Sequence, residues 1–206
     1  MFENGKFYVA KFERVSMDQF KKDTYNKDYI RKNIGLNESW FNSLDPKTTV
    51  ENVSCCVENM LSIWVESSYN KLKLPKRATT GSAGYDFFMP FDVTIKPGES
   101  IVIPTGIRCK FETDNFVLKI YPKSGLGFKY SMGLANTVGI IDSDYYYSDN
   151  EGHIMIKLTN YNHDKNIYID QGKSFAQGIF EIYGLTVDDN NDEKQVRNGG
   201  FGSTSK

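Results

Sequence analysis

The sequence has few cysteines, few histidines and no long apolar run, and each shortage excludes a class of protein. Its three cysteines include the adjacent pair Cys55 and Cys56, which fits no C-x-x-C zinc motif, and an odd number argues against a disulfide framework. Two histidines are too few for a metal cluster. The longest apolar stretches, such as 60–65, are far shorter than the roughly 20 residues that span a bilayer. Charges at Glu3 and Lys6 do not suit a signal peptide, so a cytoplasmic protein is expected.

An excess of either charge is also missing. The 206 residues carry 25 basic and 26 acidic side chains, a net charge of −1, so no overall basic field would recruit nucleic acid. A hydrophobic content of 39% is ordinary for a soluble globular chain of one domain, with or without an appendage. A complete P-loop is absent too, because Ile167 stands where the first glycine would precede Gly172-Lys173-Ser174. An anionic ligand would therefore need other local donors.

The sequence pattern changes near residue 70. Before it, Ser16–Gln19 resembles a capping box that opens a short helix, and apolar residues at three- and four-residue steps predict a helix over about 49–67. Residues 6–15 could form a strand. After residue 70, short β-branched runs at 100–103, 116–120, 154–158 and 167–169 predict strands, and Pro97-Gly98 suits a type II turn. This pattern favours a mainly β fold, a sandwich, jelly roll or barrel. The expected division is 1–70, a mostly helical extension; 71–196, a β core; and 197–206, a flexible tail.

Five segments of the β region stand out, and singly each has an ordinary structural explanation. Together they resemble, in order and spacing, the five signature motifs of the trimeric dUTPase family, most closely its bacterial and bacteriophage branch. The resemblance runs from about Leu72 to the C-terminus. It implies a jelly-roll subunit, a homotrimer whose three sites each draw on three chains, and Mg²⁺-dependent attack of water on the α-phosphate of dUTP, giving dUMP and pyrophosphate. The segments are Ala83–Asp86, Pro122–Gly127, Gly139–Tyr145, Gly172–Gln177 and Arg197–Thr204.

The resemblance also implies a role for individual residues. Asp142 would activate the attacking water and Asp86 would lie near the metal, which is held through substrate phosphates and water with no direct protein ligand. Tyr145 would press on the deoxyribose and exclude a 2′-hydroxyl, while Phe201 on the mobile tail would stack on uracil. The remaining substrate contacts would come from Lys123, Ser124, Gly125 and Gln177 to the phosphates, from Asn136, Gly139, Ile140, Ile141 and Met155 to the base, and from Arg197, Gly202, Ser203 and Thr204 to the terminal phosphate.

Three features depart from the family pattern. Lys123 replaces the usual arginine, which keeps the positive charge but loses the bidentate fork. Residues 146–151 lengthen the segment after Tyr145 by about five residues compared with the resembled motif. Arg197 lies one residue closer to its glycine pair than is usual. We refer below to 146–151 as the insert.

Two alternative functions remain open at this point. A dCTP deaminase would share a related fold, but it needs a glutamate base where this sequence has Lys157. A regulatory protein with the dUTPase fold would act by binding a protein partner, through the N-terminal extension or the insert. Such binding would not exclude catalysis, because the presumed catalytic positions are filled.

Overall fold

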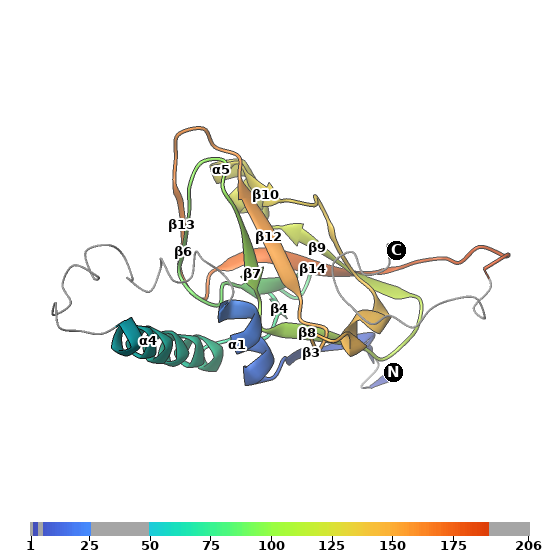
Figure 1. The fold of residues 1–206 in the computed structure, drawn as a ribbon. Helices are drawn as coiled ribbons and strands as arrows, with labels where there is room; N and C mark the ends of the chain where they lie inside the picture. The colour runs from blue at the N-terminus through green and yellow to red at the C-terminus, as the bar shows by residue number, and fades with distance from the viewer. Residues whose placement is uncertain (1, 4–5, 26–49, 190–206) are drawn as a thin grey trace.

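The computed structural model describes residues 2–3, 6–25 and 50–189, and strands dominate this part of the chain (Figure 1). The helices are α1 (Met17–Tyr25), α4 (Val50–Asn70) and α5 (Ser124–Tyr130), with the 3₁₀ helix η1 (Ser143–Tyr147). The strands are β1 (Phe2–Glu3), β2 (Lys6–Phe7), β3 (Ala10–Arg14), β4 (Lys76–Arg77), β5 (Tyr85–Phe88), β6 (Val93–Ile95), β7 (Ser100–Pro104), β8 (Ile107–Phe111), β9 (Phe116–Pro122), β10 (Met132–Leu134), β11 (Gly139–Ile141), β12 (Met155–Asn160), β13 (Ile167–Ile169) and β14 (Ser174–Ile182).

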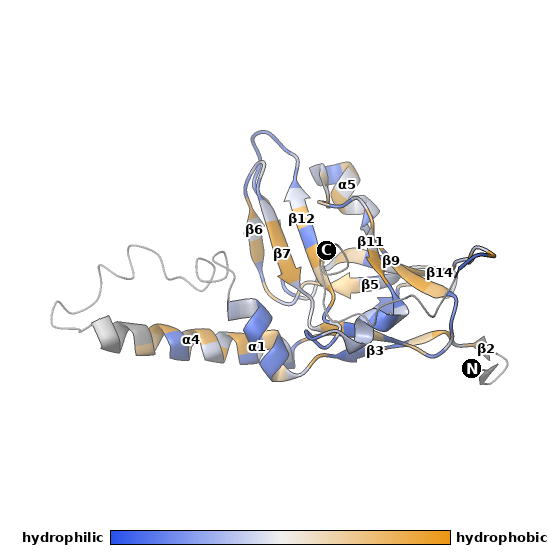
Figure 2. Cartoon of the chain, turned by 45° about the vertical axis from the view of Figure 1, so that its right-hand side comes forward, coloured by the Kyte–Doolittle hydropathy of each residue, from blue (hydrophilic) through white to orange (hydrophobic). Residues whose placement is uncertain are grey.

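The strands form several small sheets around one core. The largest has the order β11-β9-β14-β5-β4, a second has the order β10-β12-β7, and β13-β6, β3-β8 and β1-β2 are two-stranded. The mainly β fold is thus confirmed, and the described strands do not close into a barrel. Apolar side chains of these strands meet inside, where Phe87, Ile103 and Leu118 are fully buried. Figure 2 shows the hydrophobic residues along β6, β7 and β14.

Close packing in the largest sheet depends on a glycine of β14. A Cβ at Gly178 would lie 2.8 Å from Leu118 Cδ1 and 3.0 Å from Phe87 Cε2. These distances are shorter than side-chain carbons tolerate, so the neighbouring strands approach here only because the position carries no side chain. The register places Gln177, the preceding residue, opposite both Asp86 and Tyr121.

The N-terminal segment packs directly on the β core. Strand β3 pairs with β8, and the Phe12 ring contacts Phe87 and Phe180, with centroids 5.7 Å apart in both pairs. Helix α1 lies against α4 and β7 and buries Phe20 completely. In Figure 1, the N-terminal end of α4 points away from the sheets and its C-terminal end lies beside α1. The C-terminal half holds the buried Leu61 and Val65.

Most sequence-predicted elements are confirmed within a few residues. The helix predicted over about 49–67 is α4, although the side chains of Val50 and Val53 lie outside the described residues. The Ser16 hydroxyl accepts a hydrogen bond from the Gln19 N–H at 3.1 Å and so caps α1. Gly98 has a φ of 71° and the Glu99 N–H donates to the Lys96 carbonyl, as a type II turn requires. The strand considered for 6–15 is divided into β2 and β3.

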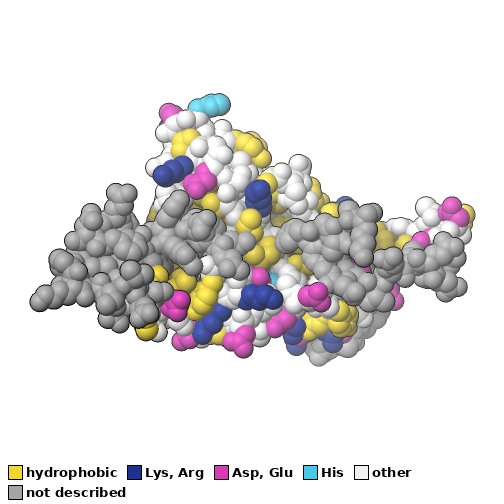
Figure 3. Space-filling view, in the orientation of Figure 1, with side chains coloured by type: hydrophobic (Ala, Val, Ile, Leu, Met, Phe, Trp, Pro, Cys, Tyr) yellow, Lys and Arg dark blue, Asp and Glu magenta, His cyan; other side chains and the backbone are white. Residues whose placement is uncertain are grey.

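The surface carries charges of both signs (Figure 3), and the three cysteines form no disulfide. Acidic and basic side chains are intermixed on the face seen in Figure 3. Cys55 and Cys56 are exposed and Cys109 is buried, and all three are free thiols; burial raises the pKa of Cys109. No helix in the described ranges is long and apolar enough to cross a bilayer.

Candidate active site

Three predicted site residues meet at one end of the largest sheet: Asp86, expected near the metal, and Lys123 and Gln177, expected to contact the phosphates. Lys123 Nζ lies 2.7 Å from Asp86 Oδ1, and both side chains are at least half-buried. Gln177 is opposite Asp86 in the strand register, and its amide nitrogen is 3.4 Å from the Pro122 carbonyl. A Cβ at Gly84 would lie 2.7 Å from Gln177 Oε1, so this glycine leaves the space that the amide occupies. We call Asp86, Lys123 and Gln177 the polar cluster.

The second motif, Pro122–Gly127, forms the start of a helix and not a loop. Ser124 and Gly125 are exposed residues at the start of α5, and Lys123 is its N-cap residue. The N–H groups of Leu126 and Gly127 donate to the Lys123 carbonyl. The first N–H groups of a helix have no intrahelical acceptor, so those of Ser124 and Gly125 are donors at the edge of the polar cluster.

The predicted base-contacting residues surround one cavity of about 510 Å³ between β11 and β12. This volume falls within the usual range for small-molecule sites. Its walls are largely apolar, and the Asn136 side chain is exposed at its margin. All five predicted positions contribute to the lining: Asn136, Gly139, Ile140, Ile141 and Met155.

Asp142 and Tyr145 occupy contrasting environments just beyond β11. Asp142 is exposed and precedes η1. Tyr145 is only 6% exposed and is not among the residues that line the cavity. Its hydroxyl donates to the His153 carbonyl at 2.8 Å and accepts from Asn150 Nδ2 at 2.9 Å. The contact of Tyr145 with a deoxyribose therefore stays a prediction.

Within one chain, Asp142 lies far from the polar cluster. Ile141 pairs with Leu118, and the antiparallel register carries Asp142 further from Lys123. Lys123 follows Leu118 by five positions, which at roughly 3.3 Å per residue separates the two points by about 16 Å. A single water molecule cannot bridge this gap. The tail residues Arg197, Phe201, Gly202, Ser203 and Thr204 lie outside the described residues.

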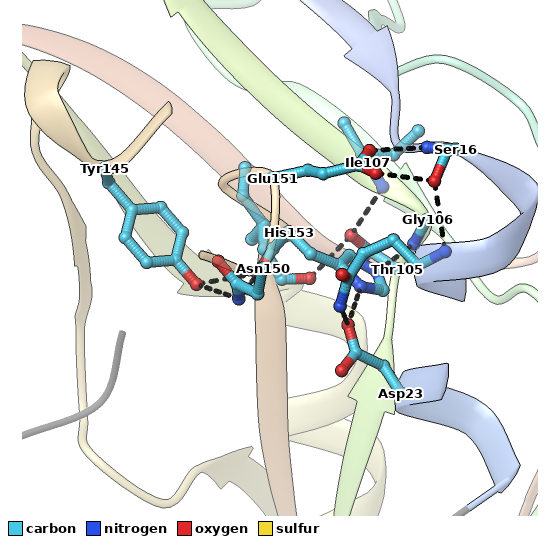
Figure 4. A network of polar contacts seen from close by, with 11 residues as sticks. Ser16, Asp23, Thr105, Gly106, Ile107, Tyr145, Asn150, Glu151 and His153 are labelled. Carbon is cyan, nitrogen blue, oxygen red and sulfur yellow. Dashed lines mark hydrogen bonds and ion pairs between the residues drawn. The ribbon is translucent and has the colours of Figure 1, made fainter. Parts of the chain in front are cut away.

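The insert contacts the N-terminal segment, a relation that sequence reasoning missed. The Tyr146 hydroxyl donates to Glu13 at 2.8 Å, and Arg108 packs over the Tyr146 ring at 4.5 Å. The hydrogen bond from Tyr146 is the main reason why the pKa of Glu13 is lowered. Glu151 accepts hydrogen bonds from the Ser16 N–H and hydroxyl (Figure 4). The only sequence signal was the capping box at Ser16, which does not indicate a distant partner.

The polar cluster offers one carboxylate, Asp86, near which a Mg²⁺ ion could lie. No group of three or more His, Cys, Asp or Glu in the described ranges could hold an ion directly. Mg²⁺ retains several waters and often uses only one or two carboxylates together with phosphates. Asp86, with one carboxylate oxygen bonded to Lys123, suits a role as acceptor for metal-bound water.

The fold and the site define a mainly β protein with a cavity of small-molecule size and a polar cluster at one end of its largest sheet. The family model for dUTPase matches residues 70–205. The deoxyuridine 5'-triphosphate nucleotidohydrolase of Lactococcus lactis is 40% identical over 134 residues, covering 65% of this chain and 88% of that protein. The protein of the same name from Actinobacillus pleuropneumoniae serotype 3 is 37% identical over 142 residues, covering 66% and 90%. The crystal structure of dUTPase from Streptococcus mutans has a TM-score of 0.52 at 34% identity, covering 57% of this chain and 90% of that one. The chain belongs to the dUTPase family.

Proposed function

We propose that the protein hydrolyses dUTP to dUMP and pyrophosphate. The observation that carries the proposal is the cavity whose lining includes all five positions expected to contact the base. The polar cluster supports it, because its ammonium and amide groups suit a phosphate chain. The names of the two bacterial relatives indicate the same substrate. The cytoplasmic location remains a prediction.

The exposed carboxylate of Asp142 orients a water molecule and accepts its proton as the water oxygen attacks the α-phosphorus. The bond from the α-phosphorus to the bridging oxygen breaks, and pyrophosphate leaves with that oxygen. Lys123, Ser124, Gly125 and Gln177 hold the phosphates, and bound Mg²⁺ supplies further neutralisation of phosphate charge. Arg197, Ser203 and Thr204 on the tail complete the phosphate contacts, and Phe201 covers the base.

Selection of uracil depends on the cavity. The amide of Asn136 and the backbone of Ile140, Ile141 and Met155 form hydrogen bonds to the base edge. A base that leaves such polar groups unpaired is rejected strongly, because each unpaired buried group costs free energy. Lys157 also lines this cavity, and its ammonium group cannot act as the carboxylate base of a deaminase.

A homotrimer completes the site. The strand register keeps Asp142 of one chain away from the polar cluster of the same chain, which supports the proposal that a neighbouring copy supplies one of them. In this proposal residues 1–70 are an addition to the family core, because the family match begins at residue 70. The segment 197–206 acts as a lid over the bound nucleotide. The proposal of a protein partner gains no support, because the insert and the N-terminal segment contact each other.

We expect dUTP to be the preferred nucleotide. With Mg²⁺, kcat/KM for dUTP should exceed that for dCTP by factors on the order of 10³ or more, since the wrong base leaves polar groups of the cavity unpaired. It should also exceed that for UTP, because Tyr145 leaves no room for a 2′-hydroxyl. The measurement is pyrophosphate release from each nucleotide, with ammonia assayed in parallel for dCTP. Comparable rates for UTP and dUTP would contradict the selection proposed for this site.

Mixing two inactive variants tests whether sites are shared between chains. Asp142→Asn and Lys123→Ala each inactivate every site of a pure trimer. When the two are refolded together in equal amounts, roughly a quarter of the sites receive Asp142 from one chain and Lys123 from another. Recovery of about that share of the parent activity is expected. If each chain builds its own site, the mixture stays inactive.

A further inference from the structure

The hydroxyl group of Tyr145 is held by the segment that follows it in sequence. It donates to the His153 carbonyl and accepts from Asn150 Nδ2, which also lies 3.3 Å from the same carbonyl. Gly152 permits this path, since its φ is 68° and a Cβ there would lie 2.6 Å from Tyr146 Cα. The orientation of the Tyr145 ring thus depends on where residues 150–153 are placed.

Helix α1 anchors this segment through a buried histidine. His153 is fully buried, and its Nε2 accepts a hydrogen bond from the Gly106 N–H at 2.7 Å. Because Nε2 is an acceptor, Nδ1 carries the proton and donates to Asp23 Oδ2 at 2.6 Å. The same carboxylate oxygen accepts from Gln19 Nε2 at 2.8 Å. The carboxylate of Asp23 on α1 therefore fixes the orientation of the His153 ring, as Figure 4 shows.

A second anchor joins the insert to the first turn of α1. In a capping box the residue at the third helical position returns to the N-cap N–H, but Gln19 bonds to Asp23 instead. Glu151 takes that place, accepting from the Ser16 N–H at 2.7 Å and from its hydroxyl at 2.6 Å. Although burial raises the pKa of Glu151, the hydrogen bonds from Ser16 keep it below its ordinary value.

We propose that α1 is a specificity element: Asp23 and Glu151 are positioning residues that hold the segment 150–153, and through it Tyr145, in the place that excludes a 2′-hydroxyl. This inference rests on the proposed function and on the contact with the deoxyribose that the family resemblance implies for Tyr145. The physical reason is that a tyrosine rejects a ribose sterically only if its ring cannot move aside. The two anchors restrain the backbone of 150–153, and this segment supplies both hydrogen-bond partners of the Tyr145 hydroxyl.

The test compares variants of α1 on both dUTP and UTP. In Asp23→Ala we expect the ratio of kcat/KM for dUTP to that for UTP to fall about 10-fold, chiefly through faster use of UTP. Asp23→Asn should keep most of the parent ratio, because its amide oxygen still accepts from His153 Nδ1. Asp18→Ala removes an exposed carboxylate from the same helix and should leave the ratio unchanged. Glu151→Ala tests the second anchor without replacing a residue of α1.

Hydrogen–deuterium exchange of a peptide spanning 145–153 provides a readout that needs no activity. Faster exchange in Asp23→Ala, but not in Asp18→Ala, is expected if α1 restrains this segment. An unchanged ratio in folded Asp23→Ala and Glu151→Ala would overturn the specificity role, and unchanged exchange would overturn the coupling itself. A parent protein that does not hydrolyse dUTP would refute the proposed function instead, while the exchange result would still decide the coupling.

Discussion

Replacing Asp142 with asparagine should lower kcat for dUTP by a factor of about 10² to 10⁴, the usual contribution of a positioned general base. Asparagine keeps the size of the side chain but cannot accept the proton of the attacking water. KM should change little, because phosphates and base are held by other residues. The measurement is initial-rate pyrophosphate release over a range of dUTP concentrations, with the parent and the variant at equal Mg²⁺.

The matched control for this prediction is Asp144→Asn. Asp144 is exposed two positions further along, in η1, so its replacement makes the same change of charge near the site. Its kcat should stay much closer to that of the parent. Equal losses in the two variants would mean that the negative charge of the segment matters rather than a base at Asp142. A fully active Asp142→Asn would assign the base to another residue.

Phe20→Ala should lower the free energy of unfolding by about 3–5 kcal/mol, the cost of emptying the site of a buried phenylalanine. Phe20 is fully buried, and its ring lies 5.6 Å from that of Tyr69 and 6.2 Å from that of His153. The side chain therefore fills space between α1, α4 and the segment that holds Tyr145. For a chain of this size the melting temperature should fall by roughly 10 °C.

Ile63→Ala is the control for this measurement. Ile63 is on α4, which packs against α1, but it is 69% exposed, so its loss should change the free energy of unfolding by no more than about 0.5 kcal/mol. Thermal unfolding should be followed at matched protein concentrations, because the melting temperature of an oligomer depends on concentration. If Phe20→Ala unfolds like the parent, the N-terminal segment does not share a core with the β domain.

Local features of the fold were readable from the sequence. The stripe that includes Leu61 and Trp64 predicted α4, and the Trp64 ring packs on Phe91 with centroids 5.0 Å apart. The turn at Pro97-Gly98 and the cap at Ser16 depend on neighbouring residues only, so their signals are local. The Gly-rich second motif was harder to interpret, since Ser-Gly-Leu-Gly suggests a loop but begins α5.

The sequence by itself determined the family and the residues that belong to its motifs, because motif order and spacing are properties of the chain. Only the tertiary structure decided how they are grouped: antiparallel pairing joins Asp86 to Gln177 and directs Asp142 away from Lys123. It also decided that Glu151 accepts the hydrogen bond from the N-cap N–H of Ser16, although the two residues are 135 positions apart in sequence. Such contacts arise when distant segments bury a common core, and no local pattern encodes which partner a polar side chain will meet.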